Sequence, residues 1–158
     1  MRAAFEARYE APDKLHITLA FLGNVQSSQL DDIAAIIDGV AARTPAFELT
    51  LDKLGAFPNE RRPRIVYIGS RAAPSAFRSL AGELRDEYGR LGFQFQDDVA
   101  VHVTIGRVKG GSARPLPMLD IAPLKVHVHE IALFETVPDE KTTRYVVRHT
   151  ASLNGTET

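Results

Sequence analysis

The 158-residue sequence contains no cysteine. Without cysteine the chain can form no disulfide, zinc finger, iron–sulfur cluster or thiol nucleophile, and it lacks the usual mark of a small secreted domain. Charge of either sign is not in excess, because 19 Lys and Arg residues stand against 20 Asp and Glu residues. A general basic field of the histone kind is therefore excluded, and an anionic ligand must be bound by a local group of residues.

Long apolar runs are missing as well, since no stretch approaches the roughly 20 residues that a membrane-spanning helix needs. The first ten residues mix charges with aromatic rings instead of forming the apolar core of an export signal. We therefore expect a cytoplasmic protein with no membrane partner. With 44% hydrophobic and 25% charged residues, the composition suits one globular domain, residues 1–158, or two small lobes sharing a core.

Apolar periodicity predicts more strands than helices. Helices are expected over residues 27–43 and 75–92. Strands are expected over residues 15–22, 47–54, 65–69, 99–108, 124–134 and 143–151, the last two forming a hairpin. Residues 1–9 have the spacing of the last turns of a helix, and residues 153–158 have the composition of a frayed tail. Because strands follow one another in hairpin-like pairs, the expected fold class is α+β.

One short pattern occurs twice and carries the functional prediction. The segments 15–19 (LHITL) and 101–105 (VHVTI) share the order apolar, His, apolar, Thr, apolar. Side chains alternate along a strand, so each His and its Thr share one face. A single His-x-Thr is more often an ordinary hydrogen-bonded or solvated face. Two copies, one in each half of the chain, instead indicate two imidazoles and two hydroxyls gathered across one groove.

These side chains suit displacement at phosphorus. The attacking oxygen must lose a proton and the leaving oxygen must gain one, and imidazole, with an unperturbed pKa of about 6.5, can serve in either role. Threonine hydroxyls can donate hydrogen bonds to the non-bridging phosphoryl oxygens as charge develops on them. The scheme requires no metal and no cofactor.

The two motifs and their flanks resemble the two-histidine (2H) phosphoesterases, specifically the RNA 2',3'-cyclic phosphodiesterases historically called 2'-5' RNA ligases. The matching flanks are residues 12–15 (PDKL), residues 21–23 (FLG), Arg107, residues 55–64 and residues 131–135 (IALFE). The resemblance covers roughly residues 8–150. It implies a bilobal α+β fold, with two antiparallel sheets related by a pseudo-twofold, helices outside and the active-site groove between the lobes.

The resemblance also implies an activity, the metal-independent hydrolysis of an RNA terminal 2',3'-cyclic phosphate to a 2'-phosphomonoester. By the family's pattern His16 is the proton donor, His102 is the proton acceptor, and Thr18 and Thr104 hold the phosphate. The reverse reaction would join RNA ends through a 2'-5' linkage. Two alternatives stay open, an RNA-ligating enzyme in the cell and a non-catalytic module that binds an AMP-like nucleotide or an RNA end.

Two arginines are further candidates for substrate binding. Arg107 lies five positions after His102, which in a regular strand would put it on the opposite face. A bulge or strand end at Gly106 would turn it toward the phosphate, as in the family. Arg62 belongs to a basic stretch, residues 58–64, that could form a rim for RNA. A solvated loop with unrelated charges explains this stretch equally well.

Three further features of the sequence are weaker indications of a site or of the fold. His127 and His129 share a strand face, but no carboxylate or cysteine is spaced to complete a metal site, so no metal is expected. Base-stacking rings are expected among Phe57, Phe93, Phe95 and Phe134, although most strand aromatics belong to the core. Family members usually begin with an additional strand and the start of a helix, so we expect a truncated lobe or an edge covered by a partner. The oligomeric state is not predicted.

Overall fold

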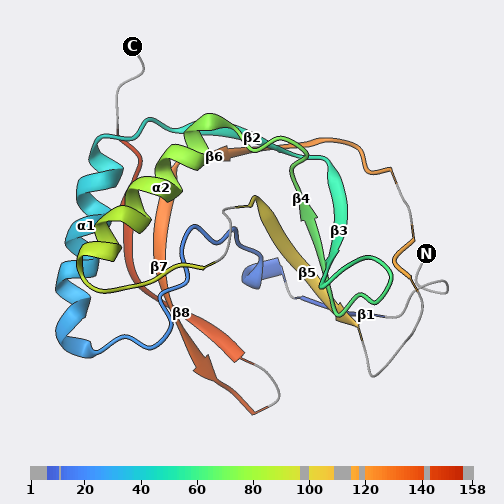
Figure 1. The fold of residues 1–158 in the computed structure, drawn as a ribbon, viewed down its shortest axis with the longest axis horizontal. Helices are drawn as coiled ribbons and strands as arrows, with labels where there is room; N and C mark the ends of the chain where they lie inside the picture. The colour runs from blue at the N-terminus through green and yellow to red at the C-terminus, as the bar shows by residue number, and fades with distance from the viewer. Residues whose placement is uncertain are drawn as a thin grey trace. The chain divides into compact units, whose positions relative to one another are not determined.

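The computed structural model describes residues 7–10, 12–96, 100–108, 115–117, 120–140 and 143–154. The fold is α+β, as predicted: the described residues form two α-helices and several antiparallel strand pairs (Figure 1). Contacts divide the chain into two compact units, each assembled from three segments. The first unit comprises Met1–Thr18, Thr50–Ala73 and Ala100–Val126, and the second comprises Leu19–Leu49, Pro74–Val99 and His127–Thr158.

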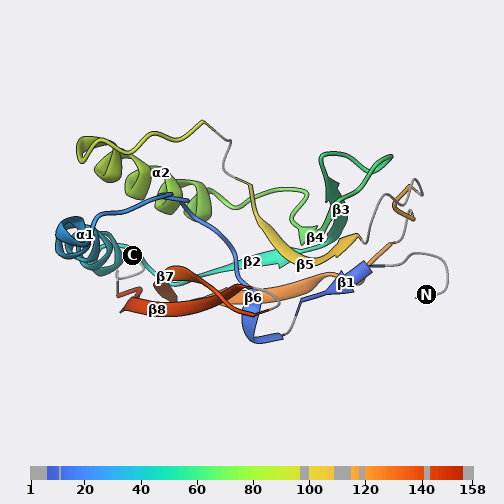
Figure 2. The ribbon, with the colours of Figure 1, turned by 90° about the horizontal axis from the view of Figure 1, so that it is seen from below.

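The first unit contains a four-stranded antiparallel sheet in the order β1-β5-β4-β3 (Figures 1 and 2). The strands are β1 (Ala7–Tyr9), β5 (His102–Val108), β4 (Ile65–Gly69) and β3 (Lys53–Phe57). β3 and β4 form a hairpin, and β5 lies between β4 and β1. A small core of Ala56, Val66 and Leu116, with Leu54, Ile105 and Val108 against it, stabilises this unit.

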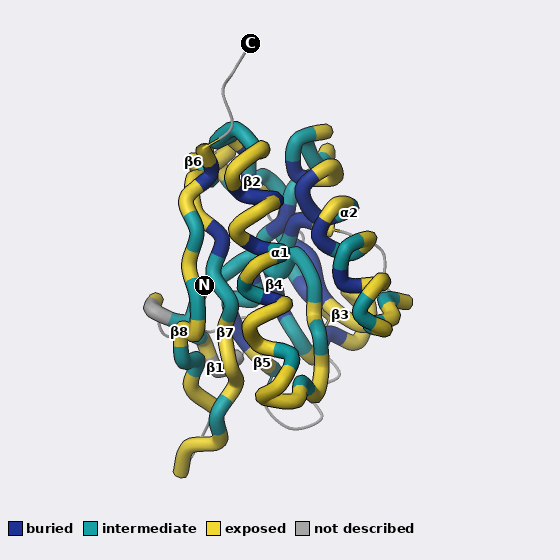
Figure 3. The backbone as a smooth tube through the Cα atoms, turned by 90° about the vertical axis from the view of Figure 1, so that its left-hand side faces the viewer, coloured by how far each residue is buried: buried dark blue, intermediate teal, exposed yellow. Residues whose placement is uncertain are grey.

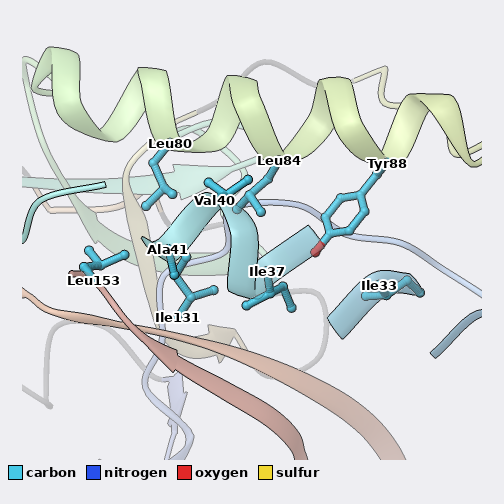
Figure 4. Packing of buried hydrophobic residues seen from close by; sticks show 9 residues of the cluster. All are labelled: Ile33, Ile37, Val40, Ala41, Leu80, Leu84, Tyr88, Ile131 and Leu153. Carbon is cyan, nitrogen blue, oxygen red and sulfur yellow. The ribbon is translucent and has the colours of Figure 1, made fainter. Parts of the chain in front are cut away.

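The second unit packs two helices on a β-hairpin. Its helices are α1 (Leu30–Ala42), preceded by the 3-10 turn η2 (Ser27–Gln29), and α2 (Ser75–Arg90), and its hairpin consists of β7 (Glu130–Pro138) and β8 (Thr143–Ser152). Buried residues recur along each helix (Figure 3), and Figure 4 shows the side chains of α2 pointing toward those of α1. The core residues are Ile33, Ile37, Val40, Ala41, Leu80, Leu84, Tyr88, Ile131 and Leu153.

Both helices lie where the periodicity predicted them. Gly92, with φ of +99°, follows α2 in the left-handed conformation that favours glycine, as expected of a C-terminal cap. Tyr88 near the end of α2 is 3% exposed, and burial raises its pKa to about 12, so the phenol remains neutral within the core. Neither described helix combines the length and apolarity needed to cross a membrane.

Two expectations for the first 22 residues are wrong. Ala7–Tyr9 is a strand rather than the end of a helix, because its backbone pairs with β5, and pairing outweighs the weak helical preference of so short a segment. Residues 1–6 lie outside the described residues. The strand expected over residues 15–22 is reduced to a single bridge at Ile17, and Leu15 and Phe21 are 45% and 74% exposed. Past that bridge, Leu19 and Leu22 pack against the core of the second unit instead.

The remaining strand predictions need smaller corrections. The strand expected over residues 47–54 is β2 (Phe47–Leu51), followed by β3. The strand expected over residues 124–134 is two strands, β6 (Leu124–Val128), which pairs with β2, and β7. Leu153 is not frayed: it is 8% exposed, and its backbone N–H donates to the carbonyl of His129 at 2.8 Å. Burial of that one leucine ties the end of β8 to the core.

Candidate active site

The two His-x-Thr segments lie side by side within the first unit. Ile17, between the first His and Thr, forms an antiparallel bridge with Val103, the corresponding residue of β5. The 3-10 turn η1 (Pro12–Lys14) separates this bridge from β1, which pairs with the other end of β5. Because β4 occupies the second edge of β5, the first motif extends the sheet on the β1 side.

The bridge determines which side chains share a face. Residues flanking an antiparallel pair lie across from each other, which places His16 opposite Thr104 and Thr18 opposite His102. Side chains alternate along a strand, so all four project from the face opposite to that of the bridge residues. Directly opposed Cβ atoms lie about 4.5–5.5 Å apart. This register brings the Cβ of each histidine close to the Cβ of the threonine in the other motif.

The same kind of backbone contact orients both imidazoles. The Nδ1 of His16 is 2.7 Å from the carbonyl oxygen of Lys14, and the Nδ1 of His102 is 3.4 Å from the carbonyl oxygen of Ala100. A carbonyl oxygen only accepts hydrogen bonds, so Nδ1 carries the proton, and Nε2 is the nitrogen that takes up or releases a proton. The contact of His102 is long for a hydrogen bond, so its ring depends more on packing.

A β-bulge in β5 brings Arg107 to the face of the two motifs. The pairing with β4 shifts register between Val66 and Tyr67, which leaves Ile105 of β5 as the extra residue. One extra residue reverses the alternation beyond it, so Arg107 shares a face with Thr104, three positions earlier. The bulge that the sequence required is present, one residue before the expected glycine.

Arg107 also lies beside a carboxylate that the sequence analysis did not single out. Its Nε is 3.8 Å from Oε1 of Glu10, and its side chain remains 62% exposed. The backbone N–H of Glu10 donates to the carbonyl of Ile105 at 2.8 Å, which fixes this residue beside the bulge. Arg107 is thus held on the motif face while staying accessible to an anion.

Two aromatic rings form a corner around His102. The Phe57 ring centroid is 5.4 Å from that of His102 at an interplanar angle of 84°, and the Tyr67 centroid is 5.8 Å away at 69°. The two aromatic rings stack on each other at 4.6 Å and 27°. Lys53 places its Nζ 5.9 Å from the centroid of Tyr67. We call Phe57, Tyr67 and His102 the aromatic corner.

The basic stretch of residues 58–64 forms the loop between β3 and β4. Asn59 shapes it, because its Oδ1 accepts hydrogen bonds from the backbone N–H groups of Arg61 and Arg62, both at 3.0 Å. The N–H of Arg64 donates to the carbonyl of Phe57 at 2.8 Å and closes the loop. Arg62 is exposed on this loop, which begins directly after the aromatic corner.

The other candidate residues lie apart from the paired motifs. Phe93, Phe95 and Phe134 belong to the second unit, the first two packed against its core. The rings of His127 and His129 stack at 5.8 Å, and no group of three or more metal-ligating side chains occurs among the described residues. Phe57 is in contact with the motif histidine His102.

Sequence analysis missed Tyr67 and Gly55 as parts of this site. The signal for them was a glycine within an otherwise apolar strand, which often marks the close approach of another group. Gly55 pairs with Tyr67 across the β3–β4 hairpin, and the tyrosine ring lies over it. The periodicity predicts the strands but not which ring fills the space above a glycine.

Comparisons with known proteins agree with this arrangement. A family model described as LigT like Phosphoesterase matches residues 1–67. The chain is 33% identical over 105 residues to the RNA 2',3'-cyclic phosphodiesterase of Methanothermobacter thermautotrophicus, aligning 66% of its own length and 56% of that relative. It is 28% identical over 139 residues to the enzyme of the same name from Thermotoga maritima, aligning 86% of its own length and 74% of that relative.

A solved structure has the same fold. Escherichia coli LigT complexed with 3'-AMP superimposes with a TM-score of 0.74 at 28% identity, covering 97% of this chain and 83% of that chain. The aligned part of the chain spans little more than half the length of the archaeal relative.

Proposed function

We propose that this chain, which resembles the LigT-like phosphoesterases, hydrolyses the 2',3'-cyclic phosphate at an RNA end to a 2'-phosphomonoester. The observation that supports the proposal most is the antiparallel pairing of two His-x-Thr segments, in which both imidazoles have Nδ1 at a carbonyl oxygen. Such a pair supplies a base and an acid on one face, as displacement at phosphorus requires. The names of the relatives supply the substrate.

In the proposed mechanism, Nε2 of His102 takes a proton from water as the water oxygen attacks phosphorus. The bond between phosphorus and the 3' oxygen breaks, and His16 gives the proton on Nε2 to that oxygen. The short hydrogen bond from Nδ1 of His16 to Lys14 supports the donor role, because such bonds strengthen when the donor is charged. The donor and acceptor roles otherwise follow the family's pattern.

The phosphate would be bound by neutral and cationic hydrogen-bond donors on the same face. Thr18 and Thr104 would each donate a hydroxyl hydrogen bond to a non-bridging oxygen as charge develops there. Arg107, on the same face because of the bulge, would add a charge-assisted hydrogen bond. Arg62 would contact a phosphate further along the RNA strand. None of these steps requires a metal, and the same site run in reverse would form a 2'-5' linkage.

The test of the function is turnover of 2',3'-cyclic AMP and of an RNA ending in a cyclic phosphate, in EDTA, with the products separated by chromatography. We expect hydrolysis that EDTA does not reduce, with the 2'-phosphate as the sole product. Release of the 3'-phosphate would contradict the assigned leaving group. Binding of AMP with no turnover of either substrate would favour the non-catalytic binding module.

Phe57 is the proposed stacking platform for the base that carries the cyclic phosphate. Its ring is 40% exposed, Tyr67 supports one side of it, and it contacts His102. Base stacking on an aromatic ring is worth about 1–3 kcal/mol, so Phe57→Leu should raise KM for 2',3'-cyclic AMP by about 5- to 100-fold. The measurement is steady-state kinetics with this substrate and with a ribose 2',3'-cyclic phosphate that lacks a base.

The control is Leu124→Ala, since Leu124 is an apolar residue that is 58% exposed on β6. This variant should leave kcat and KM unchanged. The Phe57→Leu effect on KM should disappear with the base-free substrate. An equal rise in KM for both substrates would mean that Phe57 supports His102 and binds no base.

A further inference from the structure

Gly55 lies where a side chain would collide with a ring of the aromatic corner. A Cβ at this position would lie 2.4 Å from Cζ, 2.5 Å from the hydroxyl oxygen and 2.8 Å from Cε1 of Tyr67. Non-bonded carbon atoms in a packed protein do not approach closer than about 3 Å, so the tyrosine ring would have to move. Tyr67 is 9% exposed, and the sheet lies beneath it, so it can move only outward.

A second glycine supports the other end of the same ring. Gly69 pairs with His102, and a Cβ there would lie 3.2 Å from Cε1 of Tyr67 and 2.6 Å from the backbone oxygen of Val101. Because both glycines lack a side chain on this face, the sheet has a shallow depression there, and the tyrosine ring occupies it. In this position the Tyr67 ring, on β4, lies next to His102 on the neighbouring strand β5.

His102 depends on this support more than His16 does. The Nδ1 contact of His102 is 3.4 Å, whereas that of His16 is 2.7 Å. Contacts with Tyr67 and Phe57 limit the rotation of the His102 ring. A displacement of about 1 Å in a catalytic group can cost 100-fold in rate, so the seating of Tyr67 bears on the reaction.

We propose that Gly55 and Tyr67 are positioning residues: the missing side chain at Gly55 lets the Tyr67 ring lie against the sheet, where it holds His102 in the orientation for proton transfer. The proposal rests on the proposed catalytic role of His102. It assigns no chemistry to Tyr67 itself. The ring, rather than the hydroxyl, carries the effect.

The kinetic test is a double-mutant cycle on kcat and KM for 2',3'-cyclic AMP. Gly55→Ala should lower kcat about 10- to 100-fold, with a smaller change in KM, because the phosphate-binding side chains are untouched. Tyr67→Leu should lower kcat similarly, and Tyr67→Phe should retain most of it. In the Tyr67→Leu background, Gly55→Ala should cost nothing further, because no ring remains to be displaced.

The control is Gly82→Ala in α2, where an added Cβ meets nothing within 4 Å. It should leave kcat unchanged. Additive losses in the cycle, or wild-type kcat for Gly55→Ala, would overturn the proposal. Tyr67→Leu tests the same support without a clash and so decides the question even if Gly55→Ala fails to fold.

A readout independent of turnover separates this proposal from the proposed function. The ring nitrogens of the histidines can be followed by long-range proton–nitrogen NMR. Gly55→Ala should shift the His102 ring signals and leave those of His16 in place. If the wild-type protein hydrolyses nothing, the proposed function fails, while the NMR result still decides whether Gly55 positions His102. Unchanged His102 signals would overturn the positioning role.

Discussion

His102→Ala is expected to lower kcat for 2',3'-cyclic AMP by about 10²–10⁴-fold, the usual contribution of a general base or acid. Alanine removes the imidazole that is proposed to take the proton from water. KM should change little, because the side chains proposed to bind the phosphate, Thr18, Thr104 and Arg107, remain in place. Steady-state kinetics at several pH values measures the effect, and the limb of the pH profile that belongs to the base should disappear.

His16→Ala should lower kcat for 2',3'-cyclic AMP by a similar factor, for a different reason. Its proton is needed only when the leaving oxygen is a poor leaving group. The nitrophenolate of a nitrophenyl phosphodiester leaves without protonation, so His16→Ala should hydrolyse this diester almost as fast as the wild type, whereas His102→Ala should stay slow. If His102→Ala hydrolysed the nitrophenyl diester at the wild-type rate and His16→Ala did not, the proton donor would be His102 and the proton acceptor would be His16.

A histidine outside the paired motifs provides the control. His149 contacts Asp38 in the second unit, with Nε2 2.7 Å from Oδ1. His149→Ala should therefore hydrolyse both substrates at the wild-type rate. Full activity in either His16→Ala or His102→Ala with the cyclic substrate would contradict the mechanism.

Leu84→Ala is expected to reduce the free energy of unfolding by about 2–5 kcal/mol, the range for a leucine removed from a close-packed core. Leu84 is 2% exposed on α2 and packs in the helix–hairpin core of the second unit (Figure 4). Alanine would leave a cavity that neighbouring helices can only partly fill. Urea denaturation followed by circular dichroism gives the change.

The matched control is Leu124→Ala, because Leu124 is 58% exposed on β6. Removing an exposed leucine should change the unfolding free energy by less than about 0.5 kcal/mol. A loss below 1 kcal/mol for Leu84→Ala would mean that the core rearranges around the smaller side chain. Equal losses at both positions would contradict the packing described.

Periodicity was enough to predict the helices, because each has a long apolar stripe and α2 ends at a glycine cap. The same rule failed for residues 15–22, where alternation looked like a full strand. Only Ile17 pairs there, because beyond it Leu19 and Leu22 pack against the core of the second unit, while Phe21 is 74% exposed. Alternation predicts which side chains can be buried, but it does not say against which element.

For the site, the duplicated His-x-Thr was sufficient to identify the two segments that meet. Spacing alone left the face of Arg107 open, because only a bulge or strand end near Gly106 would turn it to the face of His102. The structure has that irregularity at Ile105. Gly55 left a local trace, a glycine within an apolar strand, but that trace does not identify Tyr67 as the ring above it. Glu10 was not inferable, because its place beside Arg107 depends on register with β5, far away in the sequence. Such register is a property of the folded sheet and leaves only weak traces in local spacing.

The interleaving of the two units has a consequence for how the protein is made. Each unit draws on three separated segments, and the Ile17–Val103 bridge joins residues 86 positions apart, the difference of their numbers. On the ribosome, the first motif therefore waits, unpaired, until β5 has emerged. Since long-range pairing slows folding, this interval is when the nascent chain most needs protection from aggregation.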